Sequence, residues 1–136
     1  MKIVICLDYN SFIEKLLGIV KNVVDNMKSA EISVIHIIDL SLFYGTSSFE
    51  EELIKDLEDN SDKLKEMCIQ YLGDKIAYIK ESGLPALKIG ELLDSSPYDM
   101  LIVGTHGKKL LGERLMGSLA ERLLHNSKKP VLIIPD

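Results

Sequence analysis

Short apolar runs alternate along the chain with longer segments in which apolar residues recur every three or four positions. The runs are rich in β-branched residues and cover residues 3–7, 32–38, 76–79, 100–103 and 131–134. Most are apolar at consecutive positions, which is typical of strands covered on both faces of a parallel sheet. Five such strands joined by helices predict an α/β fold with a doubly wound five-stranded parallel sheet and helices on both faces.

Four segments carry the helical spacing. They cover residues 11–28, 49–72, a stretch from Pro85 to the Ser-Ser-Pro sequence at 95–97, and 118–126. Three open with a hydroxyl residue followed three positions later by glutamate, the pattern of a capping box: Ser11 with Glu14, Ser48 with Glu51, and Ser118 with Glu121. We therefore expect helices to begin at these residues, with the acidic residues of 50–66 on a solvated face.

The 136 residues show no internal repeat and no linker, so we expect a single domain over 1–136. Cys6 and Cys68 lack the spacing of metal ligands and are interpreted as buried apolar residues, which favours a cytoplasmic protein. No apolar stretch approaches the length of roughly 18 residues that spans a membrane. The net charge of -5 argues against nucleic-acid and anionic-membrane partners.

The fourth strand is followed by a glycine-rich loop with a local excess of positive charge. Residues 104–129 hold six basic and two acidic side chains, a net charge of +4, so the rest of the chain carries -9. Glycines and a helix N-terminus can turn backbone N–H groups toward phosphate oxygens. The same residues also suit an ordinary tight turn and an ordinary helix cap, and the spacing alone leaves both interpretations open.

Asp8 follows the first strand, and its carboxylate is available to a ligand if Ser11 caps the next helix. The alternative is that Asp8 forms a local Asx turn. With strand order 3-2-1-4-5, strands one and four are neighbours where the order reverses, and Asp8 and Gly104 border one crevice. A receiver-like order, 2-1-3-4-5, would place functional residues after strand three. That strand ends in Lys80-Glu81-Ser82 without an aspartate, which disfavours the receiver-like order.

Four residues complete a recognisable motif. Gly104, Gly107, Gly117 and Ser118 fit Gly-x2-Gly-x9-Gly-Ser/Thr, and a basic helix and an apolar strand after Pro130 follow. The chain thus resembles the universal stress protein family in its nucleotide-binding branch, over nearly its whole length. The resemblance implies a Rossmann-like fold of the adenine nucleotide alpha hydrolase type, with ATP, alone or with Mg²⁺, in the strand one/strand four crevice.

The resemblance also implies roles for particular residues. Asp8 would contact the nucleoside and reach a metal only through nucleotide-bound Mg²⁺, Ile37 would offer backbone groups to the adenine, and Val103 would wall the ribose. The phosphates would be wrapped by the glycine loop and the next helix start: Gly104, Thr105, His106, Gly107, Lys108, Lys109, Gly117, Ser118 and Leu119. We predict neither a protein-held metal nor a catalytic residue.

Three positions depart from the family's usual residues. Tyr9 follows Asp8 where the family often has glycine or phenylalanine, Ala120 replaces a second hydroxyl, and Cys6 replaces a proline. The resemblance implies that Ala120 lacks one phosphate contact, worth about 1 kcal/mol. His106 is interpreted as a loop residue, His36 as a satisfied core histidine and His125 as a partner of a helix C-terminus.

No phosphate-transfer or adenylylation motif accompanies the loop, so the function predicted first is a cytoplasmic ATP-binding regulatory module of the stress response. Two alternatives remain: a ligand-free interaction protein that forms dimers, and a slow nucleotide hydrolase using Asp8 and His106. The last strand is an apolar edge, which predicts a homodimer through Val131, Leu132, Ile133 and Ile134.

Overall fold

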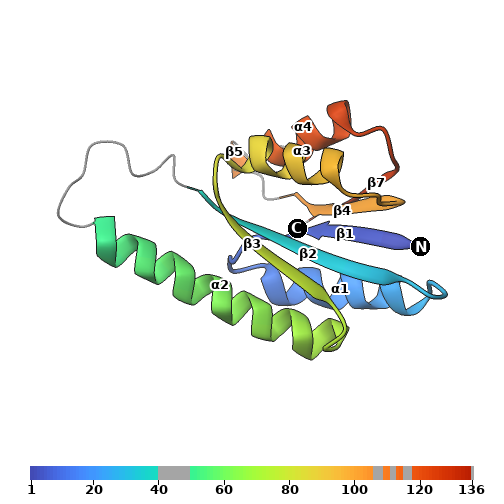
Figure 1. Cartoon of the computed structure of the whole chain (residues 1–136), viewed down its shortest axis with the longest axis horizontal. Helices are drawn as coiled ribbons and strands as arrows, with labels where there is room; N and C mark the ends of the chain where they lie inside the picture. The colour runs from blue at the N-terminus through green and yellow to red at the C-terminus, as the bar shows by residue number, and fades with distance from the viewer. Residues whose placement is uncertain (40–49, 106–108, 111–112, 115–117, 136) are drawn as a thin grey trace.

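Five parallel strands form the central sheet in the order β3-β2-β1-β4-β7 (Figure 1). The computed structural model describes residues 1–39, 50–105, 109–110, 113–114 and 118–135. Its main elements are β1 (Lys2–Cys6), α1 (Ile13–Asp25), β2 (Glu31–Asp39), α2 (Glu50–Leu72), β3 (Ala77–Gly83), α3 (Pro85–Ser95), β4 (Met100–Gly104), α4 (Ser118–Asn126) and β7 (Val131–Ile134). With β7 as the fifth long strand, the predicted order 3-2-1-4-5 is confirmed.

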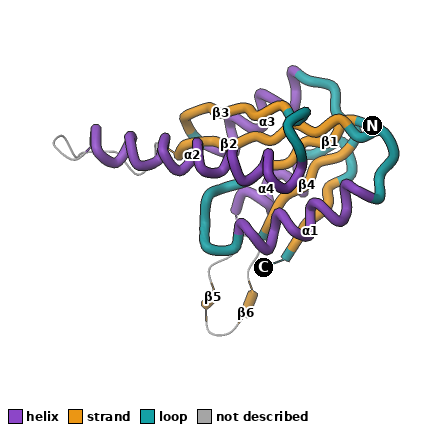
Figure 2. Tube along the Cα trace, turned by 90° about the horizontal axis from the view of Figure 1, so that it is seen from below, coloured by secondary structure: helices purple, strands orange, loops and turns teal. Residues whose placement is uncertain are grey.

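The helices lie in two layers, α1 and α2 on one face of the sheet and α3 and α4 on the other (Figures 1 and 2). The sheet has a hydrophobic core on each face, and alternate residues of β1 pack into one or the other. Ile3 and Ile5 pack with residues of α1 and α2, whereas Val4 and Cys6 pack with residues of α3 and α4. Because both faces are covered, the central strands are apolar at consecutive positions.

β3 extends beyond the apolar run that marks this strand in the sequence. The apolar run covers 76–79, but the strand continues to Gly83 and pairs with β2 from Ser33↔Ala77 to Asp39↔Gly83. Residues 80–82 are exposed, which suits a strand at the edge of the sheet. Backbone pairing with β2 therefore extends β3 beyond its apolar residues.

The capping box predicted at Ser11 is wrong. α1 begins at Ile13 with no side-chain hydrogen bond from its N-cap residue, Phe12. Asn10 organises this start instead: its Oδ1 accepts from the Phe12 N–H at 2.9 Å, and its carbonyl accepts from the Ile13 N–H at 3.2 Å. An asparagine that bonds the backbone two residues ahead forms an Asx turn, which places Ser11 within the turn. The side chains of Ser48 and Ser118 lie outside the described residues.

The loop after β4 contains a short hairpin that the sequence did not predict. β5 (Lys109–Leu110) pairs with β6 (Glu113–Arg114) in antiparallel register. The structure also confirms the interpretation of the thiols, because Cys6 and Cys68 are free and buried, and burial raises the pKa of each to about 12. None of the described helices combines the length and the apolar character needed to cross a membrane.

Candidate functional site

β1 and β4 lie side by side and run in the same direction, with Cys6 opposite Val103. β2 flanks β1 on its other side, so the strand order reverses between β1 and β4. The carboxyl edge at such a reversal is where doubly wound sheets bind ligands. Asp8 follows β1, and Gly104 ends β4, so the structure brings the two residues to the same edge.

The Asp8 side chain is 69% exposed at this edge, yet one of its oxygens is held. Oδ1 accepts from the Tyr9 N–H at 2.9 Å and lies 3.3 Å from Nε2 of His36. Both contacts fall on Oδ1, so within the described part of the chain Oδ2 has no hydrogen-bonding partner. Asp8 does not cap α1, as expected. The residue that bonds the start of this helix is Asn10, however, and not Ser11.

His36 is 4% exposed, which confirms that it is a core histidine. Its Nδ1 lies 2.8 Å from Oγ of Ser61 on α2, and that hydroxyl lies 2.9 Å from the phenol oxygen of Tyr78 on β3. The phenol donates to the Ser61 carbonyl at 3.0 Å. Burial raises the pKa of Tyr78 to about 12, with a smaller opposing contribution from the Ser61 hydrogen bond. A polar chain therefore runs from the carboxyl edge of the sheet into the core.

The sequence did not predict that His36 reaches Asp8. The two residues are 28 positions apart, and their contact depends on the parallel register of β1 and β2, in which Cys6 stands opposite Ile35. A polar residue inside an apolar run was the only sequence signal. It marked His36 as unusual but gave no partner.

The end of β4 is packed closely. A Cβ on Gly104 would stand 2.9 Å from Cδ2 of Leu16 on α1, so this glycine permits a close approach between strand and helix. The Thr105 N–H donates to the Ile134 carbonyl at 2.9 Å. That amide therefore extends the pairing of β4 with β7, and phosphate contacts from this loop would come from other groups.

The remaining predicted residues divide into three sets. Ile37 and Val103 are buried and pack on the α3/α4 side of the sheet. Leu119 is half-buried on α4 and packs against the same cluster. His106, Gly107, Lys108 and Gly117 lie outside the described residues, and for Lys109 and Ser118 only the backbone is described.

Ala120 is 2% exposed and belongs to the apolar cluster under α3 and α4. A hydroxyl at this position would sit in that cluster in the present packing. The described residues also hold no group of three or more His, Cys, Asp or Glu side chains placed to bind a metal ion.

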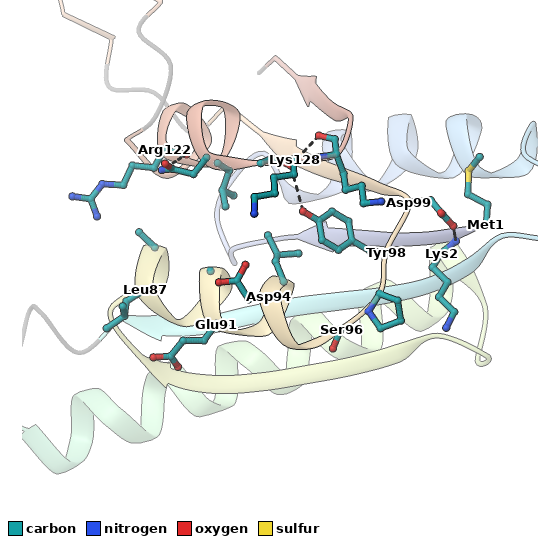
Figure 3. Close-up of a pocket in the computed structure, with 18 of the residues that line it drawn as sticks. Met1, Lys2, Leu87, Glu91, Asp94, Ser96, Tyr98, Asp99, Arg122 and Lys128 are labelled. Carbon is teal, nitrogen blue, oxygen red and sulfur yellow. Dashed lines mark hydrogen bonds between the residues drawn. The ribbon is translucent and has the colours of Figure 1, made fainter.

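A groove of about 1080 Å³ lies at the opposite end of the sheet, between α3, α4 and the start of β1 (Figure 3). Its lining mixes both charges, with Lys2, Arg122 and Lys128 near Asp94 and Asp99. Doubly wound sheets bind ligands at the carboxyl ends of their strands. The groove adjoins the amino ends of β1 and β4, so it is not the candidate site.

The sequence profile of the universal stress protein family matches residues 1–135. The chain belongs to this family. It is 35% identical over 111 residues to the universal stress protein MJ0531 of Methanocaldococcus jannaschii, an alignment that covers 77% of this chain and 65% of that protein. It is 30% identical over 127 residues to MJ0577, a universal stress protein of the same organism, covering 79% of this chain and 78% of the relative.

Solved structures agree with this assignment. The structure of MJ0577 superposes with a TM-score of 0.78 at 30% identity and covers 99% of this chain and 95% of that one. UspA of Lactobacillus plantarum has a TM-score of 0.76 at 16% identity, with 98% and 97% covered. A universal stress protein solved in complex with cAMP has a TM-score of 0.63 at 18% identity, covering 98% and 96%. At these lower identities the likeness shows the fold.

Proposed function

We propose that this universal stress protein domain binds ATP at the carboxyl edge of β1 and β4 and acts as a nucleotide-dependent regulatory module. The observation that supports the proposal is that Asp8 and Gly104 lie at the same edge of the sheet, where the strand order reverses. An exposed carboxylate suits a nucleoside hydroxyl or amine, and a glycine-bounded loop suits phosphates.

The proposed roles follow the geometry of the edge. Asp8 would contact the nucleoside through Oδ2, while backbone groups of Ile37 and the side chain of Val103 would border the base and ribose. Phosphate contacts are proposed for the glycine loop and the start of α4. The net charge of +4 over residues 104–129 supports a small polyphosphate, because the rest of the chain carries -9.

The buried polar chain does not provide a nucleophile for hydrolysis. Ser61, His36 and Asp8 are the residue types of a nucleophilic triad, and their polar atoms lie 2.8 and 3.3 Å apart. However, Ser61 has 0% exposure, and its hydroxyl lies against the phenol of Tyr78. A nucleophile must reach its substrate, so this serine supplies no hydrolytic centre.

We also propose that a second copy covers β7. This strand lies at the edge of the sheet, and Val131, Leu132 and Ile133 are half-buried while Ile134 is buried. An uncovered apolar edge strand is an aggregation hazard, and pairing across a two-fold axis removes it. The proposed module is thus a cytoplasmic homodimer with one nucleotide site in each copy.

The binding proposal is tested by purifying the protein under native conditions, denaturing it and identifying released nucleotides by mass spectrometry. Calorimetric titration with ATP, ADP and AMP then gives the preference. Asp8→Asn should weaken ATP binding by about tenfold, the cost of one charge-assisted hydrogen bond.

The matched control is Asp94→Asn, which changes another exposed aspartate beside the groove at the far end of the sheet. Its ATP affinity should equal that of the wild type. Absence of released nucleotide, together with no heat and no melting shift on ATP addition, would overturn the proposal.

A further inference from the structure

Four side chains link the crevice to the interior. Asp8 lies at the carboxyl edge, His36 on β2, Ser61 on α2 and Tyr78 on β3, and successive polar atoms lie 3.3, 2.8 and 2.9 Å apart. Exposure falls steeply along this path. The Asp8 side chain is 69% exposed, whereas His36 is 4% and Ser61 0% exposed.

The hydrogen positions follow from what each group can do. A carboxylate can only accept, so a favourable contact with Asp8 requires a hydrogen on Nε2 of His36. Nδ1 then faces the hydroxyl of Ser61, which can either accept from or donate to the ring. Ser61 therefore suits either state of Nδ1, and it is the carboxylate of Asp8, 3.3 Å from Nε2, that favours a hydrogen on Nε2.

The interior end of the chain is fixed. Tyr78 donates to the Ser61 carbonyl, and its phenol is neutral at ordinary pH; burial raises its pKa further, to about 12. The described residues leave no buried side-chain nitrogen or oxygen without a partner. A satisfied buried network limits the rotation of its members, so the imidazole presents Nε2 at one position.

We infer that His36 is a positioning residue for the ligand site: anchored by Ser61, it fixes the orientation of the Asp8 carboxylate at the crevice. Its effect on ATP binding rests on the proposed nucleotide site. The Tyr9 N–H also holds Oδ1 of Asp8, at 2.9 Å, and the imidazole restricts the carboxylate further. Ordering this exposed side chain in advance lowers the entropy cost of binding. The arrangement leaves Oδ2 of Asp8 for the ligand.

A double-mutant cycle tests the inference with ATP as the probe. His36→Leu should weaken ATP binding by about five- to tenfold, and it should have no further effect in an Asp8→Ala chain, because without the carboxylate His36 has no side chain to position. His36→Gln keeps a side-chain N–H and should restore most of the affinity. Additive losses in the cycle would overturn the inference, as would equal losses for the leucine and glutamine variants.

Ser61→Ala provides a variant that leaves both His36 and Asp8 in the chain. It should weaken ATP binding by about two- to threefold, because His36 loses its anchor. The matched control is Ser127→Ala, since Ser127 also meets a tyrosine, with its Oγ 3.4 Å from the phenol oxygen of Tyr98, but at the other end of the sheet. That variant should bind ATP as the wild type does, and equal losses in the two would contradict the inference.

Ligand-free NMR separates this inference from the proposed function. The Nε2 resonance of His36 should have the shift of a protonated nitrogen and move in Asp8→Asn. The Asp8 carboxyl carbon should move in His36→Leu and in Ser61→Ala, but not in Ser127→Ala. If the wild type binds no ATP while these shifts appear, the nucleotide proposal fails and the positioning contact stands. If the Asp8 carbon is unchanged in both variants, the positioning contact is refuted whatever the ligand.

Discussion

The end of β4 touches α1 so closely that a Cβ on Gly104 would stand 2.9 Å from Cδ2 of Leu16. The backbone at Gly104 is not in the left-handed region, so space rather than conformation requires the glycine. Gly104 also ends β4, so this close approach of strand and helix lies beside the candidate site.

Gly104→Ala should lower the free energy of unfolding by about 1–2 kcal/mol, since the new methyl group displaces the end of Leu16. Shortening the neighbour in the double variant Gly104→Ala, Leu16→Ala should cost less than the two single changes together. The control is Gly18→Ala on α1, where a Cβ meets no atom within 4 Å. That change should stabilise the protein by about 0.5–1 kcal/mol. Urea unfolding measures the wild type and the four variants, and an unaffected Gly104→Ala protein would refute the close contact.

Asn10 rather than Ser11 should stabilise the start of α1. Asn10→Ala removes the hydrogen bond from the Phe12 N–H and should cost about 1 kcal/mol in urea unfolding. Ser11→Ala changes an exposed turn residue and should stay within about 0.5 kcal/mol of the wild type. A larger loss of stability in Ser11→Ala than in Asn10→Ala would support the capping box instead.

The two buried thiols should make the protein less stable at high pH. Their pKa values rise from 9.0 to about 12 on folding, so the unfolded chain loses thiol protons first as pH increases. Between pH 9 and 12 each thiol should therefore lower the free energy of unfolding by up to about 1.4 kcal/mol per pH unit, with no such effect below pH 9.

Urea unfolding at pH 8 and pH 10 measures this loss. The double variant Cys6→Ala, Cys68→Ala should lose less stability between the two pH values than the wild type. An identical loss in both proteins would show that the thiols do not cause it.

The exposed edge of β7 should pair with a second copy. Sedimentation equilibrium at micromolar concentration should give about twice the chain mass of 15.2 kDa. Val131→Lys should shift the protein toward monomer, with circular dichroism checking that it stays folded, whereas Leu124→Lys on an exposed position of α4 should not. A monomer mass for the wild type would contradict the pairing.

The strand order could be predicted because the sequence marks the sheet and its functional edge independently. Consecutive apolar runs predicted strands covered on both faces. The receiver-like order was disfavoured because strand three ends without an aspartate, and the order 3-2-1-4-5 makes β1 and β4 neighbours. The pairing of Cys6 with Val103 confirms that they are. The family match over residues 1–135 agrees with the motif that ends at Ser118.

Other features depend on contacts that no local pattern records. The sequence has the capping motif at Ser11, but Asn10, one residue earlier, forms an Asx turn in place of the capping box. β3 continues through polar residues because β2 pairs with it, which burial alone does not reveal. The contact between His36 and Asp8 needs the register of two strands and the anchor on α2, so it emerges only from the folded chain.

The central claim is that ATP binds at the carboxyl edge of β1 and β4. A ¹H–¹⁵N NMR titration of the wild-type protein with ATP tests it most directly, because each backbone amide reports its own surroundings. We predict that the amides of Asp8, Tyr9 and residues 104–109 and 117–119 shift together and saturate, while those of Lys2, Asp94 and Lys128 at the far groove stay unchanged. Shifts confined to that groove, or none at saturating ATP, would contradict the account.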